Sequence, residues 1–153
     1  MKKLLFTALA LVSINTCILA KDELVKTNDP MAQAKADEQL KIQNKEIVKL
    51  VVEAASKKLP QKVDDYTKYV SIKSEGLNLI STFEINTTPK SDEKVIEEDK
   101  PRMEQFIKKG ICQSSKRFLQ SDIGITYIYL NASTKKELFR FSMTEKDCLK
   151  YRK

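Results

Sequence analysis

The side chains that carry most proton-transfer and metal chemistry in enzymes are scarce in this sequence. It has no histidine, three cysteines and three glycines among its 153 residues. Ser-His-Asp and Cys-His sites need an imidazole to accept a proton, and the usual zinc sites combine histidine with cysteine. The composition therefore excludes these sites, and three glycines are too few for a phosphate-binding loop.

Carboxylates are the remaining candidates for acid–base chemistry. They occur in three runs, Asp64-Asp65, Asp92-Glu93 and Glu97-Glu98-Asp99. Two carboxylates can hydrolyse a glycosidic bond, but adjacent acidic residues more often cap a helix or lie in solvent. The last run also lacks the alternating ligands and the turn glycine of a calcium loop. We therefore predict no catalytic residue, no metal site and no cofactor.

The cysteines give a sharper prediction. Cys17 lies in the first twenty residues, which leaves Cys112 and Cys148 in the rest of the chain. An even pair in an exported protein is typical of a disulfide, and a bridge closing this loop would contribute about 3–4 kcal/mol. A catalytic thiol would need a base to hold its thiolate, and the chain has no histidine for that role. We predict a structural disulfide; a thiol- or carboxylate-dependent envelope enzyme is the alternative.

The aromatic residues near the C-terminus alternate along two segments. Tyr127, Tyr129, Phe139 and Phe141 would share one face of a hairpin, where cross-strand neighbours meet. Such a patch could bind a peptide, a glycan or an acyl chain. Aromatic stripes on strands usually face the core, which is the interpretation that we favour.

Two asparagines lie in glycosylation sequences. Glu84-Ile85-Asn86-Thr87-Thr88 fits the acidic-x-Asn-x-Thr acceptor of some bacterial systems, whereas Asn131-Ala132-Ser133 fits only the shorter Asn-x-Ser form. Both sequences arise often by chance, and modification depends on an enzyme of the host.

Residues 1–20, MKKLLFTALALVSINTCILA, have the layout of a secretory signal peptide. Two lysines precede an apolar run, and Ala20 offers a cleavage site. Export to the periplasm or beyond follows from this. Membrane association would require either lipidation of Cys17, which has a poor lipobox before it, or retention of the leader as an anchor.

Charge limits the partners. Loss of Lys2 and Lys3 with the leader lowers the net charge from +7 to +5. A basic surface favours anionic envelope components or acidic proteins. The basic residues are spread along the chain, so we do not expect nucleic acid as a partner.

The remaining sequence predicts one domain with alternating helical and extended segments. Residues 21–31 form a flexible lead-in, residues 32–149 the domain and residues 150–153 a basic tail. A helix over 32–59 would bury a stripe formed by Ala36, Leu40, Ile47, Leu50, Val51, Ala54 and Ala55.

A hairpin with strands around 70–72 and 77–86 follows, then a polar loop with a helical turn near Val95. A helix from Pro101 pauses near Cys112 and resumes to about Ser121. A second hairpin covers 123–130 and 138–144.

This pattern predicts an α+β fold, in the order helix-strand-strand-helix-strand-strand. We expect an antiparallel sheet of two hairpins with helices packed on one face.

The order of these segments and the cysteine pair resemble those of a group of small exported bacterial proteins with no assigned activity. The resemblance runs from about Leu59 to Cys148 and is carried by LPQKVDDYT at 59–67, Ile111-Cys112, Arg117-Phe118-Leu119, Tyr127-Ile128-Tyr129 and Asp147-Cys148. It implies a two-cysteine α+β domain and transfers no catalytic residue.

Together these features favour a non-enzymatic periplasmic or secreted protein that binds or assembles another envelope component. An immunity or inhibitor protein against an envelope hydrolase or toxin is a second hypothesis, and sequence does not distinguish the two.

Overall fold

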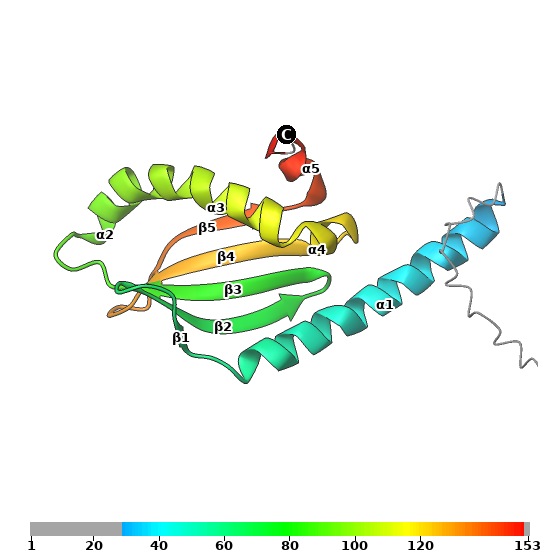
Figure 1. Cartoon of the computed structure of the whole chain (residues 1–153), viewed down its shortest axis with the longest axis horizontal. Helices are drawn as coiled ribbons and strands as arrows, with labels where there is room; N and C mark the ends of the chain where they lie inside the picture. Colours follow the sequence, from blue (N-terminus) through cyan, green and yellow to red (C-terminus); the bar gives the residue numbers. More distant parts are fainter. Residues whose placement is uncertain (1–28, 152–153) are drawn as a thin grey trace, which may run out of the picture.

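A computed structural model describes residues 29–151 of the chain. Within them, five strands form one sheet in the order β1-β2-β3-β4-β5, and the fold is α+β as the sequence predicts (Figure 1). The strands are β1 (Gln61–Lys62), β2 (Thr67–Glu75), β3 (Asn78–Ile85), β4 (Gly124–Asn131) and β5 (Glu137–Met143). No helix of residues 29–151 is long and apolar enough to cross a membrane. The signal peptide and Cys17 lie outside the described residues.

The pairing of the two hairpins differs from the expected one. Strands β2 and β3 are antiparallel, as are β4 and β5, but β3 and β4 are parallel, with Leu79 opposite Ile125 and Phe83 opposite Tyr129. The short β1 adds a further antiparallel edge. The parallel pair arises because the helical connection between β3 and β4 runs back along the sheet, so β4 starts at the same end as β3.

That connection is a chain of helices. It consists of α2 (Asp92–Lys94), a π-helical turn η1 (Val95–Asp99), α3 (Lys100–Ser114) and α4 (Lys116–Gln120). The side chain of Ser91 accepts a hydrogen bond from the Lys94 backbone N–H, so the helical run begins at Asp92 rather than at the predicted Pro101. Pro101 instead lies in the first turn of α3.

The first helix, α1 (Pro30–Ser56), begins two residues before the predicted start. Asp29 caps it by accepting from the Met31 N–H at 2.9 Å, and Pro30 suits the first helical position. It ends before Leu59, because a residue that precedes a proline avoids helical geometry. Pro30 and Met31, which were expected in the lead-in, are thus helical, and residues 21–28 lie outside the described residues.

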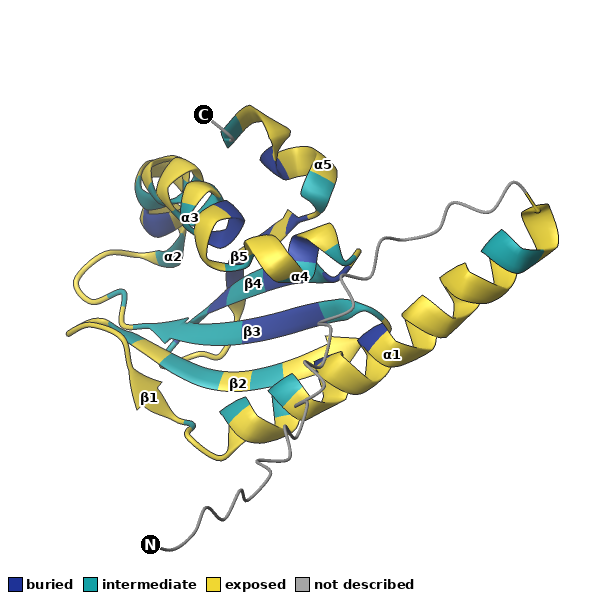
Figure 2. Ribbon diagram, turned by 45° about the vertical axis from the view of Figure 1, so that its right-hand side comes forward, coloured by how far each residue is buried: buried dark blue, intermediate teal, exposed yellow. Residues whose placement is uncertain are grey.

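The buried stripe predicted for this helix is wrong in part. Leu40, Ile47 and Leu50 are exposed, as are Ala36 and Ala54, while Asn44 and Val48 are the buried residues. Among residues 29–151, the fully buried side chains of this helix begin at Asn44, and its N-terminal part projects beyond the sheet (Figure 2). Asn44 was not predicted because it is polar; its Nδ2 donates to the Ser121 carbonyl oxygen at 2.8 Å.

One core cluster joins α1, α3 and α4 to the sheet and to the C-terminal segment. It contains Val48 of α1, Leu79, Ile111 and Cys112 of α3, Leu119, Ile123, Ile125, Met143 and Cys148. Because Val48 and Ile111 both pack on the sheet face that carries Leu79 and Ile125, α1 and α3 cover the same face. We call this group the disulfide cluster.

The disulfide lies within this cluster. Cys112 and Cys148 are joined, with their Cα atoms 5.4 Å apart, and Cys148 is 2% exposed. The short helix α5 (Glu145–Cys148) places Cys148 through a capping box, in which Asp147 Oδ2 accepts from the Thr144 hydroxyl and N–H. The following turn η2 (Leu149–Tyr151) includes the start of the predicted basic tail, and Tyr151 packs against the cluster.

A second core cluster lies toward the other end of the sheet. It contains Val95, Tyr129, Leu138, Phe139 and Phe141, and we call it the aromatic cluster. Half-buried apolar side chains of β3 and α3 pack against it, among them Phe83 and Met103.

Candidate binding surface

The four aromatic residues singled out from the sequence do come together. The Tyr129 ring centroid lies 5.2 Å from that of Phe139 and 6.0 Å from that of Phe141. Tyr129, Phe139 and Phe141 are between 2% and 6% exposed, so their rings belong to the core, whereas Tyr127 is half-buried. The expected patch thus has only one member at the surface.

Two further rings extend this group across the sheet. Phe83 on β3 lies 5.1 Å from both Tyr127 and Tyr129, and Tyr69 on β2 stacks on Phe83 at 4.8 Å. Neither Phe83 nor Tyr69 was among the aromatic residues singled out from the sequence. A bulge between Tyr69 and Ser71 shifts the register of β2, so that Tyr69 lies opposite Phe83 and Ile72 opposite Ser81.

The tyrosine hydroxyls stay neutral. Burial raises the pKa of Tyr129 well above its usual range, with smaller contributions from Tyr127 and Asp64. Burial also raises the pKa of Tyr127, and that of Tyr69 despite the hydrogen bond between its hydroxyl and Ser81 Oγ at 2.9 Å. These rings therefore offer an uncharged surface rather than an acid or a base.

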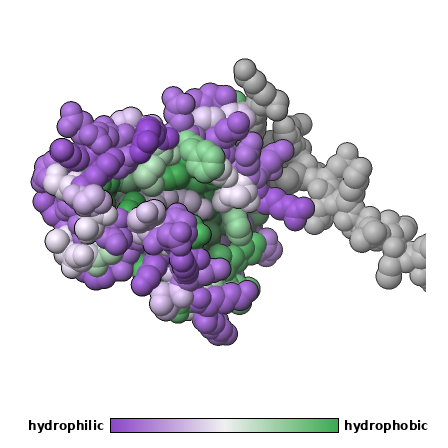
Figure 3. All heavy atoms as spheres, turned by 60° about the vertical axis from the view of Figure 1, so that its left-hand side comes forward, coloured by the Kyte–Doolittle hydropathy of each residue, from purple (hydrophilic) through white to green (hydrophobic). Residues whose placement is uncertain are grey.

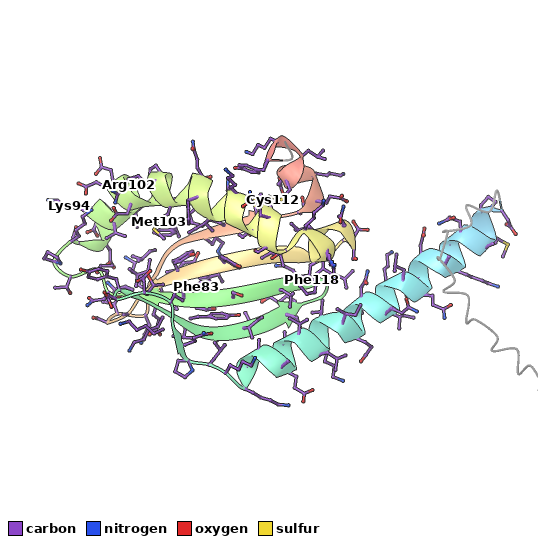
Figure 4. All side chains as sticks on the ribbon, in the orientation of Figure 1. Phe83, Lys94, Arg102, Met103, Cys112 and Phe118 are labelled. Carbon is purple, nitrogen blue, oxygen red and sulfur yellow. A yellow bond between two sulfur atoms is a disulfide. The ribbon has the colours of Figure 1, made fainter. Side chains whose placement is uncertain are left out.

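Half-buried apolar side chains continue from these rings onto the flanking helices. We call them the apolar strip: Val51 and Val52 of α1, Tyr69, Ile72, Phe83 and Tyr127 of the sheet, Met103 and Ile107 of α3, and Phe118 of α4. Figure 4 labels Phe83, Met103 and Phe118 on three different elements. In the space-filling view, apolar side chains gather in a hollow bordered by hydrophilic ones (Figure 3).

A cleft of about 380 Å³ adjoins the strip at Met103. Its walls come from Tyr66, from the loop after β3, and from the first turns of the helical connection, where Val95, Asp99 and Arg102 take part. Ile85 of β3 contributes to the wall and packs against the aromatic cluster as well. The apolar surface therefore continues from the sheet into this cleft.

An ion-pair network holds one wall of the cleft. Lys90 Nζ lies 2.9 Å from Glu98 and 3.1 Å from Asp99, and Arg102 also bonds Asp99. Burial by itself would raise the pKa of Asp99, but hydrogen bonds from Lys90 and Arg102 outweigh it and lower that pKa. The carboxylate thus ties the loop that contains Lys90 to the start of α3.

The other acidic runs have local roles. Asp64 Oδ1 accepts from the N–H groups of Tyr66 and Thr67, which shapes the turn before β2. Asp92 Oδ1 accepts from Asn131 Nδ2 at 2.6 Å. Within residues 29–151, no group of three or more cysteine, aspartate or glutamate residues is placed to hold a metal ion.

Comparison with known proteins identifies the fold. No family model and no curated protein matches the sequence. Among solved structures, a protein of Pseudomonas aeruginosa that is predicted to be secreted superposes with a TM-score of 0.63 at 13% identity, over 71% of this chain and 96% of that one.

Two further structures with this fold are pilotins of type II secretion systems. The pilotin of Vibrio vulnificus has a TM-score of 0.54 at 13% identity and covers 75% of this chain and 96% of its own. The pilotin of Vibrio cholerae has a TM-score of 0.53 at 16% identity, with 76% and 99% covered. At these identities the likeness establishes a shared fold.

Proposed function

We propose that this chain is a non-enzymatic binding or assembly protein of the bacterial envelope. In this proposal the leader is removed near Ala20 and the domain acts in the periplasm or outside the cell. The apolar strip receives the apolar face of an amphipathic segment from another exported protein. Two observations support an assembly role: the fold is shared with two secretion-system pilotins, and the strip is apolar and half-open.

The chemistry of the strip argues for this kind of partner. Its rings and aliphatic side chains carry no charge, so a charged ligand would be desolvated there without compensation. The polar border beside Met103 includes Lys90, Asp99 and Arg102, which can contact the hydrophilic side of a bound segment. An amphipathic segment satisfies both surfaces at once.

Site-specific photo-crosslinking in intact cells tests the proposal. A photoreactive residue replaces Met103, which lies in the strip, or Gln105, an exposed residue on the same helix that lies outside it. We expect a discrete adduct with one exported protein from position 103 and none from position 105. The adduct should weaken at least tenfold when Phe118→Glu places a charge at the other end of the strip.

The purified partner then allows a direct measurement. A peptide covering its crosslinked segment should bind the chain and shift the ring resonances of Tyr69, Phe83 and Tyr127. If position 103 captures nothing, or if Phe118→Glu leaves the adduct unchanged, the strip is not the docking surface.

A further inference from the structure

The two glycosylation sequences of this chain lie in different environments. Enzymatic N-glycosylation bonds a sugar to the side-chain amide nitrogen of asparagine, so that nitrogen must be reachable and not engaged in the fold. Asn86 and Asn131 can be compared on both points.

The side-chain amide of Asn131 makes all of its hydrogen bonds within the fold. The residue is 7% exposed, and its Nδ2 donates to Asp92 Oδ1 at 2.6 Å and to Thr87 Oγ1 at 3.2 Å. Its Oδ1 accepts from the N–H groups of Ser133 and Thr134. An asparagine amide has two donors and two acceptor positions, and all four are occupied here. Reaction at this nitrogen would require loss of the β4–β5 turn.

Asn86 presents its amide to solvent. It follows the end of β3 and is exposed, and only its backbone N–H is tied to the sheet region, donating to the Tyr66 carbonyl oxygen at 2.8 Å. Its Oδ1 accepts from the Thr88 N–H at 3.2 Å. Among residues 29–151, no hydrogen bond engages its Nδ2.

This local turn holds the acceptor sequence in one arrangement. The bond from Thr88 N–H to Asn86 Oδ1 folds the chain back, which keeps the threonine two residues on close to the asparagine side chain. Glu84, two residues before Asn86, pairs with Lys135 Nζ at 2.8 Å, and the lysine side chain is 59% exposed. The glutamate side chain is 18% exposed, so an enzyme's cation can reach it only from the side on which the lysine lies, by replacing the lysine in the ion pair.

We propose that Asn86 is an N-glycosylation acceptor of the exported chain and that Asn131 is not. The donor is an oligosaccharide carried on a polyprenyl pyrophosphate. Asn86 Nδ2 forms a bond to the sugar C1, the bond from C1 to the pyrophosphate oxygen breaks, and the lipid pyrophosphate leaves with the electron pair. The proton from Nδ2 passes to a base of the transferase. The inference depends on export and does not require the proposed docking role, although Asn86 lines the cleft that adjoins the apolar strip at Met103.

The test expresses the full chain in a bacterium that carries an envelope oligosaccharyltransferase for acidic sequences and its lipid-linked glycan. Trypsin separates the two asparagines into the peptides 74–90 and 118–135. Mass spectrometry should find one glycan on the first peptide and none on the second. Glu84→Gln and Thr88→Val should each reduce occupancy at Asn86 at least tenfold, whereas Ser133→Ala should leave it unchanged.

The same digests report on export through removal of the leader and oxidation of Cys112 with Cys148. The proposal is overturned if Asn86 stays unmodified in the exported chain while a control acceptor in the same cells is glycosylated. It also fails if Asn131 carries the glycan or if the chain is not exported. Crosslinking at Met103 remains a separate readout, so the two proposals can fail independently.

Discussion

The disulfide cluster and the aromatic cluster lie on the same sheet face but are closed in different ways. Around the disulfide cluster, α1, α3, α4 and α5 all contribute side chains, and a covalent bond joins two of these helices. Around the aromatic cluster, α3 and the helical turns before it cover Tyr129, Phe139 and Phe141, while Tyr69 and Phe83 stay half-open. One end of the domain is therefore closed by four helices and a covalent bond, whereas the other end leaves apolar rings half-open.

Loss of the disulfide should have the largest effect on stability. The double variant Cys112→Ser/Cys148→Ser releases a loop with a sequence separation of 36 residues. We expect a loss of about 3–4 kcal/mol in the free energy of unfolding. Urea denaturation of the purified protein measures it, and reduction of the wild type should give a similar loss. An unchanged transition midpoint would mean that the helices hold this end without the bond.

Phe83→Ala should lower stability less than loss of the disulfide does, and it should weaken partner binding at the apolar strip more. Phe83 is half-buried and contacts the rings of Tyr69, Tyr127 and Tyr129, so its loss removes three aromatic pairs. We expect a cost of about 1–2 kcal/mol in unfolding free energy, together with loss of the adduct formed from position 103. Thr82→Ala, on the opposite face of β3, is the control and should retain the adduct.

Asp99→Asn should give a smaller, pH-dependent change. The pKa of Asp99 is lowered in the fold, so its ionised form contributes stability above the unfolded pKa, near 3.8, and this contribution is lost as the pH falls. We expect a loss of about 0.5–1 kcal/mol at pH 7, because surface ion pairs are weak. The wild-type and variant unfolding curves should converge below pH 3; a constant difference would exclude the carboxylate charge as the cause.

Leu40→Glu should change stability least. Leu40 is 45% exposed on the part of α1 that projects beyond the sheet. A substitution there should alter the free energy of unfolding by less than about 0.5 kcal/mol, whereas Val48→Ala, on the same helix but buried, should cost about 2 kcal/mol. Thermal unfolding of the two variants compares the two halves of the helix directly. Equal losses would mean that the projecting half is packed in solution.

Much of the fold could be predicted from local patterns. Alternation along the strand correctly assigned Tyr127 and Tyr129 to one face, and the turns around Gly76 and Asn131 follow from their residue types. The half of α1 that packs was not predictable, because its apolar residues continue past the edge of the sheet. Of the candidate surface, the sequence predicted that the rings of β4 and β5 share a face, while Tyr69 and Phe83 were missed as their partners.

The sequence by itself determined the α+β class, the order of helices and hairpins, and the residue types from which any site must be built. Only the tertiary structure decided that β3 lies parallel to β4, which rings remain half-open, and which of two asparagines keeps its amide free. Period-two alternation defines which face a side chain occupies, but the neighbouring strand depends on where a distant helix returns the chain. Exposure and hydrogen bonding depend on those same long-range contacts, so they follow from the folded structure alone.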